Sequence, residues 1–484
     1  MAIIWPWLDV YFWIFFLLAN MVFIIIIVYY ERKHPYITLA WVSFLALAPV
    51  VGFFVYIFFG RTINREKMFL LKAEQDERLH RTVNEQLQLI HEKEMDPDDK
   101  ELARFLDMVR MLIKNGNALG TTNNKVKLFS DGNEKFDALL EDIAGAKHHI
   151  NLEYYIFRDD ELGKKVVSAL AAKAKEGVKV RLLKDGAGCS SLPGDFFKEI
   201  TDAGGQVVGF FEQKLRTYFR LNFRNHRKIL VIDGTVGYVG GFNIGDEYLG
   251  KGPLGDWRDS AMRVEGDAVH MLQIRFFLDW GYETKESFEI DDDYFPEMEA
   301  VAGKRMQIVS SGPDSTEEKI KYAYLKMINS AKESIYIQTP YFVPDDSIMD
   351  ALRMAALSGV DVRIMFPCKP DHAGIYWASY SFIGQLLSSG VRAYKFDDGF
   401  IHAKTVVVDG LVSSVGSANW DNRSFRLNFE TNGIVYDREF GQEMIAAYEK
   451  DLERCTELTQ ELYDQRPKAI KIKEAIFRLA SPVL

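Results

Sequence analysis

The segment His226-Arg-Lys-Ile-Leu-Val-Ile-Asp233 occurs a second time in this 484-residue chain, as His402-Ala-Lys-Thr-Val-Val-Val-Asp409. Each copy continues through a glycine-containing stretch to an asparagine, Asn243 or Asn419, ten residues after its aspartate. Histidine, lysine and asparagine are residue types that can attack, protonate and bind a phosphodiester. The duplication therefore predicts phosphodiester chemistry at one site that contains two histidines.

The two copies lie within a longer internal repeat. Ala146–Phe157 is similar to Ala331–Phe342, and Gly177–Leu183 is similar to Gly359–Met365, in the same order along the chain. Helix-like segments alternate there with short runs of β-branched residues, a pattern typical of an α/β fold. We expect two α/β domains related by a pseudo-twofold axis, each a central mixed β-sheet flanked by helices. That symmetry would bring both histidines to the seam between the domains.

We expect four regions along the chain. A transmembrane helical hairpin would occupy residues 1–60, followed by a helical connecting segment over residues 61–124. The first repeat domain would span residues 125–300 and the second residues 301–484, which ends in an amphipathic helix. This last helix mixes basic and apolar residues, so it could bind a membrane surface or dock on its own domain.

Two uncharged runs, Val10–Tyr30 and Pro35–Gly60, predict the membrane hairpin. The first would extend for about 30 Å as a helix, the thickness of a bilayer core. The short link between the runs leaves a partly re-entrant pair as an alternative to two full spans. Basic residues are more frequent after the second run than in the link, which favours a multi-pass protein with a cytoplasmic catalytic body.

Composition narrows the class of partner. Apolar residues make up 48% and charged residues 26% of the chain, as in a globular protein, and a net charge of -10 argues against a nucleic-acid partner. Residues 213–232 nevertheless contain no acidic residue, and we expect Arg216, Arg220 and Arg224 to line a substrate approach there. The three cysteines have no metal-site spacing, so no metal is expected.

Residues two apart on a strand face the same side, so each histidine would share a face with its lysine, Lys228 or Lys404. One imidazole would attack phosphorus while the other protonates the leaving oxygen. The lysines would bind the phosphoryl oxygens together with Asn243 and Asn419.

The acidic residues near the motifs have other expected roles. Asp233 and Asp409 each precede a glycine, which favours a supporting position in a hairpin turn over direct chemistry. A carboxylate that binds the second ring nitrogen would fix the tautomer of each imidazole. Glu247 and Glu430, downstream of the two motifs, are the candidates for that task.

These motifs resemble those of the phospholipase D superfamily. Leu152–Phe157, Gly241–Tyr248, Trp257–Asp259 and the N-terminal apolar runs are similar to the bacterial cardiolipin synthases of that superfamily over nearly the whole chain. The resemblance implies an inner-membrane enzyme that converts two phosphatidylglycerol molecules to cardiolipin and glycerol through a phosphatidyl-histidine. It further implies that His226 is the nucleophile and His402 the acid and base, and it implies no cofactor.

Other functions remain open. A phospholipase D or a phosphatidylserine synthase would use water or serine as the acceptor, and a nuclease of the same superfamily would cut nucleic acid. A lipid-binding scaffold without activity is the alternative outside enzymes, although both motifs are complete. The sequence also leaves a homo-oligomer open.

Overall fold

The computed structural model describes residues 5–31, 35–57, 100–212, 223–286, 293–298, 303–315 and 317–479. The chain forms two compact units, Met1–Phe69 with Gln213–Phe223 and Leu70–Glu212 with Arg224–Leu484. Arg216 and Arg220, expected on the substrate approach, lie outside the described residues.

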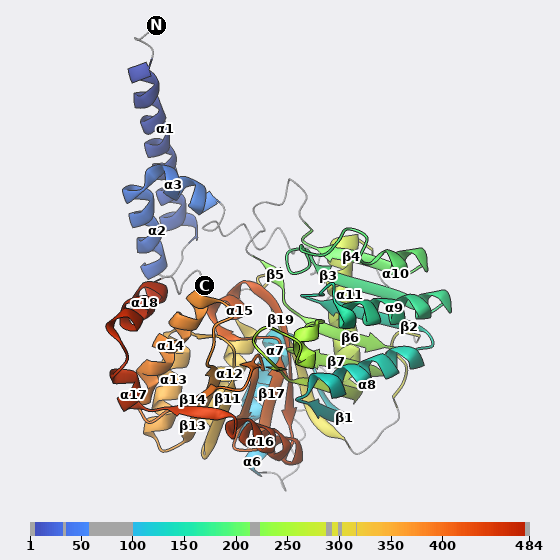
Figure 1. Ribbon diagram of the computed structural model, residues 1–484. Helices are drawn as coiled ribbons and strands as arrows, with labels where there is room; N and C mark the ends of the chain where they lie inside the picture. The colour runs from blue at the N-terminus through green and yellow to red at the C-terminus, as the bar shows by residue number, and fades with distance from the viewer. Residues whose placement is uncertain are drawn as a thin grey trace. The chain divides into compact units, whose positions relative to one another are not determined.

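Among the described residues of the N-terminal unit, one helix is long enough to cross a membrane. Helix α1 (Trp5–Ile25) continues into η1 (Ile26–Glu31), and Val10–Tyr29 within them is apolar over 20 residues. The second apolar run forms two shorter helices, α2 (Pro35–Leu47) and α3 (Pro49–Val55) (Figure 1). At 1.5 Å per residue these are only about 20 Å and 10 Å long. The prediction of a second full span, and so of a multi-pass hairpin, is wrong.

Proline explains the break between α2 and α3. Pro49 has no N–H, so the carbonyl oxygen of Leu45 loses the partner that a continuous helix would provide. The Asn20 side chain of α1 donates instead, from Nδ2 to the oxygens of Leu45 (3.2 Å) and Pro49 (2.8 Å). Since an unpaired carbonyl in an apolar environment costs several kcal/mol, Asn20 stabilises the break between α2 and α3.

The second unit contains a single continuous β-sheet built from both repeats. The first half contributes β1 (Gly120–Phe129), β2 (His149–Tyr154), β3 (Lys179–Asp185), β4 (Gln206–Phe210), β6 (Lys228–Ile232), β7 (Val236–Gly240) and β9 (Ala261–Gly266). The second half contributes β10 (Lys304–Ser311), β11 (Ser334–Gln338), β13 (Asp361–Pro367), β14 (Arg392–Phe396), β16 (Thr405–Val408), β17 (Val412–Gly416), β19 (Asn428–Tyr436) and β20 (Cys455–Leu458).

Strand order repeats in the two halves. It runs β1-β9-β7-β6-β2-β3-β4 in the first half and β10-β19-β17-β16-β11-β13-β14-β20 in the second, outward from the antiparallel pair β1–β10. The pseudo-twofold axis therefore passes between β1 and β10. Parallel pairs such as β2–β3 and antiparallel pairs such as β2–β6 confirm a mixed sheet.

Helices cover both faces of this sheet (Figure 1). The first half has α8 (Gly132–Gly145), α9 (Glu161–Lys175), α10 (Lys198–Asp202) and α11 (Ala268–Thr284). The second has α12 (Lys319–Ser330), α13 (Asp346–Leu357), α14 (Ala373–Leu387), α15 (Asn422–Arg426), α16 (Arg438–Leu452), α17 (Gln460–Asp464) and α18 (Lys468–Leu479). One hydrophobic core includes Met262 of the first half and Met306 and Val435 of the second, so the halves share buried apolar surface.

The expected connecting segment is helical only in part. Within its described residues, α6 (Lys100–Ala103) and α7 (Leu106–Gly116) are helices, but β1 begins at Gly120. The first strand of the sheet thus starts before the expected domain boundary at residue 125.

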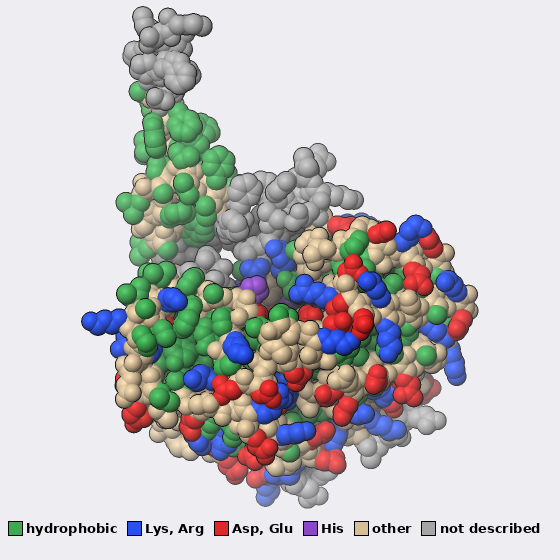
Figure 2. Space-filling view, in the orientation of Figure 1, with side chains coloured by type: hydrophobic (Ala, Val, Ile, Leu, Met, Phe, Trp, Pro, Cys, Tyr) green, Lys and Arg blue, Asp and Glu red, His purple; other side chains and the backbone are tan. Residues whose placement is uncertain are grey.

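The C-terminal helix α18 docks on the body through one face and exposes another. Glu474 is buried, where it accepts hydrogen bonds from Arg466 Nε (2.6 Å) and the Tyr463 hydroxyl (3.0 Å). On the outer face Ile472, Ile476 and Leu479 are 60%, 58% and 84% exposed. Figure 2 shows hydrophobic side chains gathered over α13, α14 and α18.

Candidate active site

Each histidine–lysine motif is held by a strand from the other half of the chain. The short strand β5 (Arg224–Asn225) pairs in parallel with Asn428–Phe429 of β19, and β15 (Phe400–Ile401) pairs in parallel with β8 (Trp257–Arg258). The pairing extends to the histidines, since His226 N donates to the Phe429 oxygen (2.9 Å) and His402 N to the Arg258 oxygen (2.8 Å). The two motifs therefore meet at the seam between the halves.

Glu430 holds the imidazole of His226. Nδ1 of His226 lies 3.0 Å from the Glu430 carboxylate and 3.2 Å from the carbonyl oxygen of Ser417. The carboxylate is fully buried, and it accepts further hydrogen bonds from the Ser417 hydroxyl (2.5 Å) and Asn428 Nδ2 (3.1 Å). Because both partners of Nδ1 are acceptors, the proton resides on Nδ1 and Nε2 keeps its lone pair.

Asp259, rather than Glu247, holds the second histidine. Nδ1 of His402 lies 2.6 Å from the Asp259 carboxylate, which also accepts a hydrogen bond from Ser260 N (2.7 Å). The Glu247 carboxylate instead accepts a hydrogen bond from Arg158 Nε (3.4 Å), so the prediction that Glu247 orients an imidazole is wrong. Asp259 takes the place in the first repeat that Glu430 takes in the second.

The motif lysines are buried beside the histidines. Lys228 Nζ donates to the carbonyl oxygen of His226 (2.6 Å) and lies 5.2 Å from the centre of the Tyr155 ring. Lys404 Nζ lies 2.8 Å from His402 Nδ1 and 3.8 Å from the Asp259 carboxylate. Burial lowers the pKa of Lys228 to about 7 and that of Lys404 to about 8.

Both imidazoles are neutral at neutral pH. Burial lowers the pKa of His226 to about 4 against the opposing effect of Glu430, and the charges of Lys228 and Lys404 lower it further. Burial and then the charge of Lys404 lower the pKa of His402 to about 4, and Lys228 contributes as well. The charges of both lysines thus lower the pKa of each histidine, so the two motifs lie close enough to interact electrostatically.

A tyrosine links the first asparagine to the second histidine. The Tyr248 hydroxyl accepts a hydrogen bond from Asn243 Nδ2 (3.1 Å) and lies 3.2 Å from His402 Nδ1. The other asparagine, Asn419, donates its backbone N–H to the Ser424 hydroxyl (3.1 Å). In both asparagines the side-chain oxygen is buried without a hydrogen-bond partner among the described residues. The sequence offered no spacing signal that singled out Tyr248.

The motif aspartates lie in tight turns. Asp233 and Gly234 have φ of 51° and 66°, and Asp409 and Gly410 have φ of 53° and 62°, as type I′ hairpin turns require. Asp233 accepts hydrogen bonds from the backbone N–H groups of Lys147, His148 and His149 at 2.8–2.9 Å. Asp409 does the same for Lys332, Glu333 and Ser334 at 2.7–2.8 Å. Each aspartate anchors the start of a neighbouring strand.

Two buried arginines next to the histidines join the halves. Arg227 binds Asp279 of its own half (2.5 Å) and donates to the Thr431 hydroxyl of the other half (3.0 Å). Arg258, also of the first half, binds Asp451 of the second half at 2.7 Å. Such pairs are costly to break because the remaining charge would be left buried.

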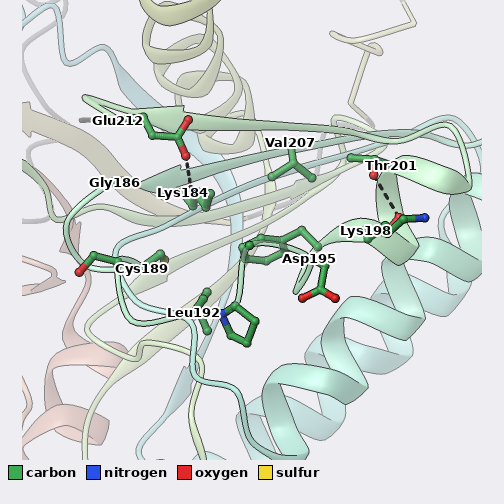
Figure 3. Close-up of a pocket in the computed structure, with 13 residues that line it drawn as sticks. Lys184, Gly186, Cys189, Leu192, Asp195, Lys198, Thr201, Val207 and Glu212 are labelled. Carbon is green, nitrogen blue, oxygen red and sulfur yellow. Dashed lines mark hydrogen bonds and ion pairs between the residues drawn. The ribbon is translucent and has the colours of Figure 1, made fainter. Parts of the chain in front are cut away.

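A separate pocket of about 470 Å³ lies in the first half beside the loop after β3. Figure 3 shows the Lys184 side chain paired with Glu212 at one side of the pocket. At another side the Thr201 hydroxyl donates a hydrogen bond to the backbone carbonyl oxygen of Lys198. The Cys189 thiol at its wall contacts the carbonyl oxygen of Tyr155 (3.5 Å), whose ring lies 4.8 Å from that of His226. Tyr155 thus stands between this pocket and the motifs. Over the part of the chain that the structure describes, no group of three or more acidic, histidine or cysteine side chains could hold a metal ion.

The chain matches two family models and many known proteins. A phospholipase D-like domain of cardiolipin synthases matches residues 139–252 and 324–454, and a phospholipase D-nuclease N-terminal domain matches residues 18–61. Major cardiolipin synthase ClsA of Bacillus subtilis is 48% identical over 97% of this chain and 98% of its own length. A cardiolipin synthase of Oceanobacillus iheyensis is 47% identical over 96% of this chain and 97% of its own length.

Among solved structures, the phosphatidylserine synthase of Haemophilus influenzae shares the fold. The superposition has a TM-score of 0.57 at 16% identity and covers 74% of this chain and 95% of that protein. The repeated α/β halves, the two histidine–lysine motifs at their seam and the full-length similarity agree with one another. This chain belongs to the cardiolipin synthase family of the phospholipase D superfamily.

Proposed function

We propose that this protein is a cardiolipin synthase that joins two phosphatidylglycerol molecules and releases glycerol. The observation that carries the proposal is the crossed pairing of His226 with Glu430 and of His402 with Asp259. It gives two neutral imidazoles with free Nε2 atoms and places two lysines beside them. That set of groups suits two successive displacements at one phosphorus atom.

In the first displacement, Nε2 of His226 attacks the phosphorus of one phosphatidylglycerol. The bond from phosphorus to the glycerol oxygen breaks, and that oxygen leaves as glycerol with a proton from His402. The negative phosphodiester raises the pKa of His402 from its low value in the empty site, so the imidazolium needed for this step forms when substrate binds. Asp259 stabilises that imidazolium through Nδ1.

In the second displacement, the terminal hydroxyl of another phosphatidylglycerol attacks the phosphorus of the phosphatidyl-histidine. His402 accepts the hydroxyl proton, the bond from phosphorus to Nε2 breaks, and cardiolipin is released. His226 is then neutral again, and His402 is the imidazolium with which the first displacement began. When cardiolipin leaves, His402 returns to the solvent the proton that it took up when substrate bound. No proton or electron is left over.

The lysines and asparagines bind the phosphoryl oxygens during both steps. Lys228 and Lys404 supply positive charge in a buried site, where it acts more strongly than in water. Rotation of the Asn243 amide by 180° would let Tyr248 donate to Oδ1 and turn the NH2 group to the unpaired position. Asn419 would present its own amide in the same way.

Attachment to a bilayer would supply the lipid substrates. Helix α1 would cross the membrane once, with Arg32 and Lys33 after it and no basic residue in residues 1–9. By the positive-inside rule, the catalytic body would then lie in the cytoplasm. The exposed apolar face of α18 would contact the surface of the same membrane.

The test uses the purified full-length protein with phosphatidylglycerol as the sole lipid. We expect cardiolipin and glycerol in equal amounts, and no cardiolipin from His226→Ala, which should remain folded and membrane-bound. Acid quenching during turnover should trap labelled lipid phosphate on His226.

Three results would contradict the proposal. Phosphatidic acid as the only product would indicate a phospholipase D, and phosphatidylserine formed only when serine is added would indicate a serine transferase. Wild-type turnover by His226→Ala would remove the nucleophile role from that residue.

A further inference from the structure

Two arginines from different halves of the chain flank the His226 end of the site. Arg224 lies two residues before His226 on β5, and the ladder of β5 with β19 continues to His226. Alternate residues of an extended segment face the same side, so Arg224 shares a face with His226. Arg423 lies on α15, four residues after Asn419.

The two arginines act on the same neighbours. Burial raises the pKa of Tyr155, and the charges of Arg224 and Arg423 both oppose that rise. Burial lowers the pKa of Arg423, and the charge of Arg224 lowers it further, as expected for two cations held near each other. Backbone geometry agrees with this, since Arg224 pairs with Asn428 of β19, and α15 is tied to Asn419 through the hydrogen bond of Asn419 N to the Ser424 hydroxyl (3.1 Å). The Tyr155 ring lies 4.8 Å from the His226 ring, so both arginines lie near the reacting centre.

The pseudo-twofold symmetry fails at these two positions. Counted from the histidines, the counterpart of Arg224 is Phe400, whose ring packs on Trp257 at 4.7 Å. Counted from the asparagines, the counterpart of Arg423 is Glu247, which binds Arg158. One end of the site therefore carries two arginines beside the buried carboxylates of Asp185 and Asp421. The other end carries an aromatic ring and a carboxylate that pairs with Arg158.

The two phosphatidylglycerol molecules also play different parts in the proposed reaction. The second phosphatidylglycerol carries a phosphodiester of its own, which stays intact while its terminal hydroxyl attacks. A three-carbon glycerol separates the two phosphates, a length comparable to the step of about 7 Å between alternate residues of a strand. The attack constrains only the hydroxyl oxygen, so rotation about the glycerol bonds lets the second phosphate turn to either end of the site.

Arginine suits that second phosphate better than any group in the motifs does. The motif lysines and asparagines serve the reacting phosphoryl group, and a guanidinium offers paired N–H donors that match two phosphate oxygens.

We propose that Arg224 and Arg423 bind the phosphodiester of the acceptor phosphatidylglycerol and so hold its hydroxyl against the phosphatidyl-histidine. This inference rests on the proposed function and names the acceptor subsite of the same centre. The arginines take no part in the first displacement, and they favour a phospholipid acceptor over water or free glycerol.

The experiment compares two reactions that share the first displacement. One is cardiolipin formation from phosphatidylglycerol vesicles, and the other is incorporation of labelled glycerol into phosphatidylglycerol, in which the acceptor has no phosphate. We expect Arg423→Gln and Arg224→Gln each to lower cardiolipin formation at least tenfold and to leave glycerol incorporation within about twofold of wild type. Arg423→Lys should recover part of the loss, because it restores the charge without the paired donors.

Arg392→Gln is the matched control, since it removes an arginine that pairs with Glu457 at the sheet edge, and it should leave both reactions unchanged. A parallel loss of both reactions in Arg423→Gln and Arg224→Gln, or no loss of either, would overturn the acceptor subsite. If the wild-type protein incorporates glycerol but forms no cardiolipin, the proposed function itself fails. The two failures are therefore distinguishable.

Discussion

At the scale of single residues, two carboxylates of different length hold the two histidines. Glu430 and Asp259 are both fully buried, and each binds Nδ1 of a histidine from the other half. Asp259→Asn would keep the side chain's size but remove the charge that stabilises the His402 imidazolium. We expect kcat for cardiolipin formation to fall by about 10²–10⁴-fold, the range of general acid–base catalysis. Initial rates on phosphatidylglycerol vesicles would measure the loss.

Glu247→Gln provides the comparison for that variant. Its carboxylate pairs with Arg158 and is not bound to either histidine, so kcat should stay within about twofold of wild type. Equal losses in the two variants would mean that Asp259 acts only through general destabilisation of the fold.

The pH dependence of kcat/KM should be bell-shaped. A nucleophilic imidazole must be neutral, so activity falls as the pH drops toward the pKa of about 4 of His226. Activity also falls as the pH rises, because lysines must be charged to bind phosphate, with pKa values of about 7 for Lys228 and about 8 for Lys404. Loss of the His402 proton, which glycerol release requires, lowers activity in the same direction. Rates measured from pH 4 to pH 9 with dilute substrate would check both limbs. Constant activity up to pH 9 would contradict the depressed lysine pKa values.

The residues of the site differ in how far the sequence could predict them. The internal repeat identified His226 and Lys228 and their counterparts in the second copy, because the same residue types recur there at the same spacing. Asp259 was missed because the loop before it makes its spacing from Asn243 longer than that of Glu430 from Asn419. Asp259 contacts a histidine that is far away in the sequence, and such a contact produces no recognisable pattern in the residues around it.

At the scale of elements, the Asp-Gly turns hold strands rather than substrate. Asp233→Asn can keep φ of 51°, because asparagine tolerates this region, but it leaves one of three backbone N–H groups without an acceptor. We expect a loss of about 1–3 kcal/mol in the free energy of unfolding. Chemical denaturation would measure it, while kcat per folded molecule should stay near wild type. His226→Gln is the comparison, and it should lose activity while its free energy of unfolding stays unchanged. An Asp233→Asn protein that keeps its stability but loses activity would show instead that the aspartate is catalytic.

The second apolar run shows why hydropathy alone overestimated the membrane crossing. Hydropathy counts side chains, whereas the path of a helix depends on its backbone hydrogen bonds. Pro49 removes one of these bonds, and Asn20 on α1 satisfies the carbonyl that is left. A polar residue within the first apolar run was the available signal.

At the scale of the whole molecule, the repeat predicted the α/β fold, the mixed sheet and the pseudo-twofold order of strands. It could not predict that β5 joins β19 and that β8 joins β15 across the seam. These exchanges are short, and they make each half contribute a carboxylate to the histidine of the other. The two repeats thus form one site whose two ends carry different residues.

The exposed face of α18 belongs to this scale, because it bears on how the catalytic body meets the lipid. Ile472 and Ile476 are more than half exposed, and each buried isoleucine side chain would contribute about 1.5–3 kcal/mol on an apolar surface. We expect the double change Ile472→Ser and Ile476→Ser to raise the apparent KM for phosphatidylglycerol in vesicles at least tenfold. Activity on a dispersed short-chain phosphatidylglycerol should stay unchanged, because that substrate needs no contact between protein and bilayer. Arg392→Gln, which removes a surface cation paired with Glu457 and no apolar side chain, is the control and should affect neither substrate. Equal losses on both substrates would show that α18 supports the fold of the site instead of its contact with the membrane.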